Sequence, residues 1–211
     1  MSEQSFKERV RLEMISMAKL YKDKYVDYEY LICSEGFVQN GYYIVDAEED
    51  NFQHLTGVHS LISPKEFFEK CYNGILQESD FDFTKEGQNE KAVKGTVRRK
   101  MNAFPAMMAL FDNDIEAEED FQKNKVVCSF AAADGSCTLG FSESEKVRPK
   151  SLIKGNALNN PSQVDLILRK KSEKELFDEI VLGDSDALER HREKIERLLS
   201  EELSVKEMKG S

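Results

Sequence analysis

Apolar side chains recur at helical spacing near the start of the chain. The repeat predicts a helix that ends near Tyr25, and Ser5 and Glu8 have the spacing of a capping box at its beginning. The residues of this apolar stripe are Val10, Met14, Met17 and Tyr21. A stripe of this kind is typical of a helix that packs one face against a core.

The middle of the chain predicts two further helices. Ser63 and Pro64 fit the N-cap and first position of a short helix that stops near Gly74. A longer helix starts at Lys91, and Pro105 is expected to kink or restart it. Its apolar face comprises Val97, Met101, Phe104, Met108 and Phe111. The acidic run 112–120 then resembles an exposed helix end.

Aromatic and β-branched runs predict strands on both sides of these helices. Residues 28–34 and 41–47 are expected to pair, and 126–133 and 138–142 flank an Asp134-Gly135 turn. Further strands are predicted at 147–153, 164–170 and 177–182, with a loop and one edge strand within 74–90. A charged helix is predicted from Asp184, with a frayed end at 205–211. The fold class is therefore α+β, with residues 1–183 as one domain and 184–211 as a helix and tail.

Composition narrows the classes of protein. Forty acidic residues against 30 basic ones give a net charge of -10, which argues against a protein that coats DNA through its overall field. The charged N-terminus lacks the apolar core of a secretory signal, and no window is long and apolar enough to span a membrane. We therefore expect a cytoplasmic protein with reduced cysteines. Cys128 and Cys137 could face each other across a hairpin, although packing is the favoured interpretation.

Three histidines are the candidates for proton transfer at neutral pH. His54 and His59 lie in one segment, FQHLTGVH, but their spacing does not place both on one helical face, so a zinc site is not predicted. His191 lies among charged residues and is expected to be solvated. A purely structural His54 remains an alternative. The sequence contains no glycine-rich nucleotide loop, so neither a metal nor a cofactor is predicted.

Basic residues gather in two segments that contain no acid. Residues 91–100 contain Lys91, Lys94, Arg98, Arg99 and Lys100. Residues 146–154 contain Lys146, Arg148, Lys150 and Lys154. If the two segments meet, they would form a phosphate-binding groove. The alternative is that both are solvated surfaces, paired with the acidic run 112–120.

Three motifs in order resemble a known family. They are FQHLTGV at 52–58, SPKEFFEKCYNGIL at 63–76 and RPKSLI at 148–153. Together they resemble the phage-type nuclease-like domains grouped with Barnase, EndoU, colicin nucleases and RelE, in the group's fourth phage class, which come from mobile elements. The resemblance covers about residues 28–171. It implies N-terminal helices packed on a curved antiparallel sheet of about four or more strands.

The resemblance also implies an activity and some of the residues that carry it. Active relatives cleave RNA without metal, by attack of the ribose 2′-OH on the adjacent phosphate. His54 then suits the acid/base role with the Thr56 hydroxyl nearby, and Ser151 suits a hydrogen bond to phosphate. From charge alone, we expect Arg148 and Lys150 to stabilise the reacting phosphate. The residues expected to bind the RNA backbone are Lys91, Lys94, Arg98, Arg99, Lys100 and Lys154.

Two functions from different classes follow from these observations. The first is a toxin-like endoribonuclease that acts on RNA, with tRNA as one candidate substrate. The second is a non-catalytic anti-defence or regulatory protein, which would use the same scaffold and its acidic tail to bind a host or immunity protein. The position of His54 distinguishes them, because a buried, fully hydrogen-bonded imidazole away from Arg148 and Ser151 would favour binding.

Overall fold

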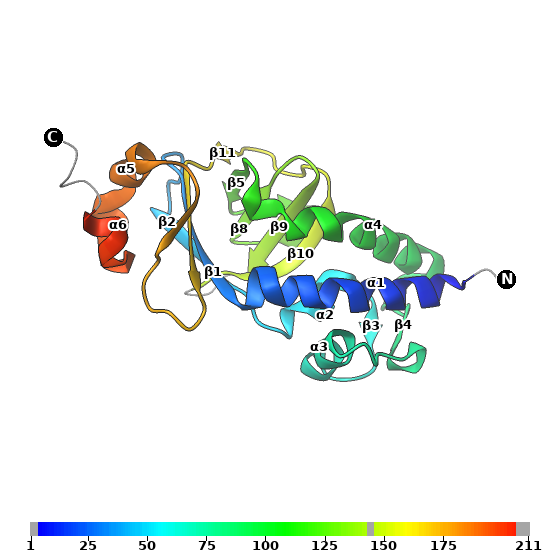
Figure 1. Cartoon of the computed structure of the whole chain (residues 1–211). Coiled ribbons are helices and arrows are strands. Elements are labelled where there is room, and N and C mark those ends of the chain that lie inside the picture. The colour runs from blue at the N-terminus through cyan, green and yellow to red at the C-terminus, as the bar shows by residue number, and fades with distance from the viewer. Residues whose placement is uncertain (1–3, 143–145, 206–211) are drawn as a thin grey trace.

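Two antiparallel sheets and a layer of N-terminal helices enclose the main core (Figure 1). The structure is a computed structural model that describes residues 4–142 and 146–205. The helices are α1 Phe6–Tyr21, α2 Asn51–Thr56, α3 Pro64–Tyr72, α4 Glu90–Met108, α5 Ser185–Ile195 and α6 Glu201–Val205, and a π-helical turn, Lys22–Val26, extends α1. Short 3-10 turns lie at Glu78–Asp80, Leu110–Asp112 and Glu196–Leu198.

The first sheet has four strands in the order β13-β12-β1-β2, and every pair in it is antiparallel. Its strands are β1 Tyr28–Cys33, β2 Tyr42–Asp46, β12 Leu166–Lys171 and β13 Glu179–Leu182. The side chains of β1 alternate, as a strand buried on both faces requires. Tyr30 and Ile32 enter the main core, whereas Leu31 and Cys33 enter a second core under α5.

The second sheet has five strands in the order β10-β9-β8-β5-β11. Its strands are β5 Glu116–Glu119, β8 Phe130–Ala133, β9 Cys137–Ser142, β10 Arg148–Lys154 and β11 Ser162–Gln163. A parallel bridge between Val45 and Val147 joins it to the edge of the first sheet. Two small pairs complete the strands: β3 His59–Ser60 with β4 Phe81–Asp82, and β6 Gln122–Lys123 with β7 Val126–Val127.

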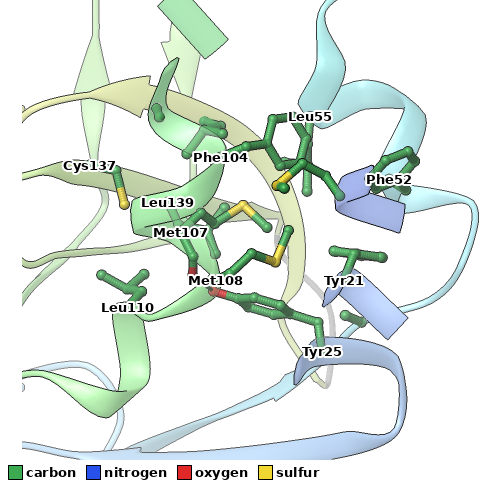
Figure 2. Packing of buried hydrophobic residues seen from close by; sticks show 14 of the residues in the cluster. Tyr21, Tyr25, Phe52, Leu55, Phe104, Met107, Met108, Leu110, Cys137 and Leu139 are labelled. Carbon is green, nitrogen blue, oxygen red and sulfur yellow. Dashed lines mark hydrogen bonds between the residues drawn. The ribbon is translucent and has the colours of Figure 1, made fainter. Parts of the chain in front are cut away.

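The helices α1 and α4 pack against each other, and α4 lies across β9 and β10. Figure 2 shows side chains of α1, α2, α4 and β9 directed toward one another in the main core. Phe104 and Met107 of α4 are fully buried there. α5 and α6 lie on the opposite face of the first sheet, at the far end of the molecule from the N-terminus (Figure 1).

Local sequence signals account for several of these elements. The side chains of Ser5, Ser63 and Asp184 accept backbone N–H groups at the starts of α1, α3 and α5, and so satisfy donors that a helix leaves unpaired. Gly135, with φ +91°, forms the turn of the β8–β9 hairpin. The predicted α+β architecture with an antiparallel sheet and a C-terminal helix is confirmed.

One expectation about the middle of the chain is wrong, and of the two outcomes expected at Pro105 the restart does not occur. The acidic run is not an exposed helix end, because β5 lies within it and pairs with the central strand β8, burying Ala117 and Glu118. Pro105 does not restart the long helix, since α4 continues through it to Met108. The side chain of Pro105 is exposed, and packing of the buried face holds the helix together around it.

The expectation for His191 is also wrong. It is almost fully buried, with its Nε2 3.4 Å from a carboxylate oxygen of Asp165. Its neighbours along the chain are charged, yet Leu188, His191 and Ile195 follow the spacing of one helical face, and that face packs on the first sheet. The helical spacing of His191 relative to Leu188 and Ile195 therefore explains why it is buried, although its neighbours in the sequence are charged.

The cysteines pack as apolar residues. All four are free and buried. Cys137 belongs to the main core and Cys128 to a small cluster on the other face of the second sheet, so the two do not form a disulfide. Burial raises the pKa of the Cys33, Cys71 and Cys137 thiols to about 12, which keeps them in the unreactive thiol form. The predicted fray at 206–211 lies outside the described residues.

No helix among residues 4–142 and 146–205 combines the length and apolar character needed to cross a bilayer.

Phe52 offers a test of how this core holds α2. Replacing Phe52 with Ala removes a fully buried ring, and we expect it to lower the free energy of unfolding by about 3–5 kcal/mol. Urea denaturation monitored by circular dichroism measures the change. Leu61→Ala is the control, because Leu61 is 55% exposed and its truncation should cost less than about 0.5 kcal/mol. Equal losses for the two variants would contradict this account of the core.

Candidate functional site

The short helix α2 directs His54 outward from the core. Phe52 and Leu55 are fully buried, while His54, just before Leu55, is exposed. Gly57, with φ +77°, adopts the left-handed conformation that ends the helix. No described residue makes a hydrogen bond to the His54 imidazole, so its ring is available to a ligand.

Thr56 belongs to the turn that follows His54. It is fully buried, and its hydroxyl donates to the Gln53 carbonyl at 2.7 Å and accepts the Val58 backbone N–H at 3.3 Å. Both bonds lie within the segment 53–58. The structure therefore places the Thr56 hydroxyl beside the backbone of α2, where it shapes the end of the helix.

Lys100 links the first basic segment to His54. Its Nζ donates to the backbone carbonyl of His54 at 2.9 Å, and its side chain covers Gly57, where a Cβ would come within 2.8 Å of the lysine Cδ. Burial lowers the pKa of the Lys100 amine to about 8, and repulsion from Lys85 adds to the shift. At pH 7 a lysine with such a pKa is still mostly a cation, and it loses its proton as the pH rises through about 8.

The other cations of α4 point along the helix toward its start. Lys94 pairs with Glu90 at 2.6 Å and lies over the ring of Phe83.

The two arginines of α4 have neutral partners. The guanidinium of Arg98 lies over the ring of Phe6, and the guanidinium of Arg99 donates to Thr96. Lys91 is exposed. These residues form one cationic stretch on α4 that ends at Lys100.

The second basic segment divides between two places. Arg148 approaches α2, because its guanidinium pairs at 2.5 Å with Glu48, just before α2, and α2 packs against β10. Lys150 is the additional residue of a bulge in β10, and its Nζ donates to the Val127 carbonyl at 2.9 Å, toward the β6–β7 pair. Lys150 lines a separate cleft of about 780 Å³ there.

The remaining residues of the second segment have other surroundings. Ser151 is half-buried on β10, and Lys154 is exposed at the end of that strand. Lys146 bonds to the buried carboxylate of Glu29 at 2.7 Å and pairs with Asp46. The structure thus brings His54, Lys100 and Arg148 to one helix, but it places Lys150 and Lys146 with different partners.

The ion pairs of the basic segments were not foreseen. Among the described residues, no ion pair joins either segment to the acidic run 112–120; their partners include Glu29, Asp46, Glu48 and Glu90. These partners come from other parts of the sequence or from one turn away on α4. Ion pairs between distant segments depend on the topology of the fold. Spacing along the chain therefore could indicate only the pair within α4, between Lys94 and Glu90.

Sequence reasoning also missed His59 as a separate feature. The sequence marks it as one of three candidates for proton transfer but assigns it no partner, and the end of α2 separates it from His54. His59 lies on β3, where its ring meets Asp82 of β4. The second histidine of FQHLTGVH and the alternating DFDFT were the available signals. Within the described part of the chain, no group of three or more His, Cys, Asp and Glu side chains is arranged to hold a metal ion.

The α+β fold, the exposed histidine and the cations beside α2 are compatible with a nuclease-like protein, and the family of the chain gives that class. The chain belongs to the family described as phage-Barnase-EndoU-ColicinE5/D-RelE like nuclease4, which matches residues 13–186. The match includes α2, α4 and β10, so the family covers the whole candidate site. A search of curated proteins and a search of solved structures each found no match. The family implies a nucleic acid as the substrate.

Gly57 tests the contact between α2 and Lys100. In Gly57→Ala the added methyl group would displace the Lys100 side chain, so we expect the pKa of the amine to rise from about 8 toward its ordinary value. NMR titration of the lysine side-chain resonances measures it.

Gly74→Ala is the matched control. Gly74 has a similar φ of +74°, but no described atom lies within 4 Å of the added Cβ. Both variants should lose about 1–2 kcal/mol of stability from the left-handed backbone. Only Gly57→Ala should change the Lys100 titration. An unchanged Lys100 in both would show that the covering contact does not control its pKa.

Proposed function

We propose that this protein is a metal-independent endoribonuclease that binds an RNA phosphate beside α2 and α4. The observation that carries the proposal is the bond from Lys100 to the His54 carbonyl, which joins a cation to the segment of an exposed histidine in a nuclease-like family. Mobile-element origin and tRNA as substrate are the finer parts of the same proposal.

The chemistry needs a base, an acid and a cation. In the proposed reaction His54 accepts the proton of the ribose 2′-OH as its oxygen attacks phosphorus. The bond from phosphorus to the 5′-oxygen breaks, leaving a 2′,3′-cyclic phosphate and a 5′-OH after a second group protonates the leaving oxygen. Negative charge that builds on the crowded phosphate is stabilised by Lys100, whose ammonium is held in place before substrate arrives.

Arg148 is the second cation proposed to contact the phosphate. Its present partner, Glu48, is a half-exposed carboxylate, and surface ion pairs of this kind stabilise a fold by only about 0–1 kcal/mol. A phosphate in bidentate contact with the guanidinium can therefore replace Glu48 at low cost. Ser151, on the same strand, is proposed to donate a hydrogen bond to the bound RNA.

The environment of His54 favours catalysis over a role in binding alone. A scaffold that had lost its activity would be expected to hold this histidine buried and hydrogen-bonded. The imidazole is instead exposed, with cations arriving from α4 and β10 around its helix. Capture of a host or immunity protein by the acidic C-terminal region remains the alternative if no RNA is cleaved.

Cleavage of tRNA in the presence of EDTA tests the proposed activity. We expect the wild-type protein to produce fragments with 2′,3′-cyclic phosphate ends, and His54→Ala and His54→Gln to be slower by about 100-fold or more. An oligodeoxynucleotide of the same sequence should stay intact because it lacks the 2′-OH. Lys65→Ala, an exposed cation on α3, is the control and should cleave normally. Equally intact RNA with wild type and His54→Ala, over a range of RNA substrates, would rule the proposal out.

The pH dependence of cleavage tests the role of Lys100. With a pKa of about 8, the protonated fraction of the amine falls about tenfold between pH 7 and pH 9. We expect kcat/KM, which reports ionisations of the free enzyme, to fall by at least this factor, since the group that protonates the leaving oxygen also loses its proton as the pH rises. Lys100→Arg keeps its positive charge over this range, so between pH 7 and pH 9 its kcat/KM should fall about tenfold less than that of the wild type. A wild-type profile that stays flat to pH 9 would remove Lys100 from the reaction.

A further inference from the structure

A second cleft, of about 700 Å³, opens beside the start of α4. It is bordered by the first turn of α1 and by the β3–β4 pair, which lie together beneath the N-terminal half of α1 in Figure 1. Its lining includes Lys7, His59, Asp82, Thr84, Lys85 and Lys94. Lys94 belongs to the cationic stretch of α4, so the cleft adjoins the surface proposed to bind RNA.

The imidazole of His59 is held in one orientation within this cleft. Its Nδ1 lies 2.9 Å from a carboxylate oxygen of Asp82 and 2.9 Å from the Thr84 hydroxyl. The Thr84 hydroxyl and backbone N–H in turn donate to the same Asp82 oxygen, at 2.6 Å and 2.8 Å. No described residue bonds to Nε2, which leaves that nitrogen for a ligand.

Asp82 is suited to support a histidine that changes its charge. Burial alone would raise the pKa of its carboxyl group, but the bonds from Thr84 and His59 outweigh it and hold the pKa below its ordinary value. The group is therefore a carboxylate at neutral pH. A carboxylate on Nδ1 fixes the ring orientation and stabilises the imidazolium form, as in other sites where a histidine transfers protons.

Stability does not explain this arrangement. The His59 side chain is 53% exposed, and an ion pair so open to water contributes little to folding. The two strands that carry it are only two residues long each. A histidine, a carboxylate and a hydroxyl oriented together at the wall of a cleft are instead the components of acid/base chemistry.

Lys100 connects this cleft to His54. Its Nζ bonds to the His54 carbonyl, and its ammonium is close enough to Lys85, in the cleft wall, to be repelled by it. In the sequence, Gly57, which the Lys100 side chain covers, lies between His54 and His59. A phosphate on Lys100 would therefore lie against the short segment that carries both histidines.

We propose that His59 is the second proton-transfer residue of the cleavage reaction, donating from Nε2 to the leaving 5′-oxygen, with Asp82 and Thr84 as positioning residues. This inference rests on the proposed ribonuclease function. In each turnover His54 gains the 2′-OH proton and His59 loses one to the 5′-oxygen, and exchange with solvent restores both. No further reactant is needed.

A substrate with a better leaving group tests this role. When sulfur replaces the bridging 5′-oxygen of a dinucleotide, the thiolate leaves without being protonated. We expect His59→Ala and His59→Gln to cleave the ordinary dinucleotide about 100-fold more slowly than wild type, with the loss in kcat. The same variants should cleave the 5′-thio substrate at the wild-type rate. His54→Ala should remain slow on both substrates, because the attacking 2′-OH still needs its base.

Variants of Asp82 separate positioning from folding. Asp82→Asn should lower kcat on the ordinary dinucleotide and regain it on the 5′-thio substrate, whereas Asp114→Asn, an exposed carboxylate outside the cleft, should change neither rate. Full activity of His59→Ala on the ordinary substrate would overturn the inference while leaving the nuclease function intact. Equal losses on both substrates would also overturn it. An inactive wild-type protein would instead refute the proposed function itself.

Discussion

The packing of Phe52 fixes the position of α2, the helix that carries the proposed base His54. The Phe52 ring meets Tyr21 of α1, Phe68 of α3 and Phe104 of α4, with centroids 5.3–5.7 Å apart. Three helices thus hold one side of a helix only six residues long, which has too few internal hydrogen bonds to be stable alone. Because α2 is anchored through its buried side, His54 on the other side has a defined direction. The reach of Lys100 and Arg148 toward the same helix follows from that anchor.

Elements with a strong local pattern were predictable from the sequence. The stripe from Val10 to Tyr21 gave α1, and the Asp134-Gly135 turn gave the β8–β9 hairpin. The errors came where tertiary contacts outweighed a local signal. The acidic run contains β5 because β8 offers it a backbone partner, and Glu119 in it accepts three backbone N–H groups of residues 38–40. His191 was judged by its charged neighbours, although its helical face was already marked by Leu188 and Ile195.

The candidate site was predictable to a smaller extent. His54 and the two basic segments were identified from motif and charge, but the segments were treated as uniform surfaces. In the fold, a β-bulge at Lys150 sends that side chain toward Val127, while Arg148 reaches Glu48 near α2. The pairing of His59 with Asp82 was equally hidden, because 23 positions separate them and only the β3–β4 register brings them together. Such contacts depend on topology, which one sequence does not specify.

The net charge of -10 does not by itself describe the surface that RNA would meet, because the partners of each cation also matter. Several cations near the candidate site already have carboxylate or aromatic partners, such as Glu48 for Arg148 and Glu90 for Lys94. Long-range attraction of RNA by such a surface is weak, because the fields of paired opposite charges largely cancel at a distance. Salt also screens the remaining field beyond the Debye length of about 8–10 Å. At contact the balance changes, since each half-exposed pair costs little to exchange for a phosphate. Recognition in this protein is therefore expected to depend on short-range fit around α2 and the neighbouring cleft. Lys100 is one of the cations there that need no such exchange, because it has no carboxylate partner among the described residues.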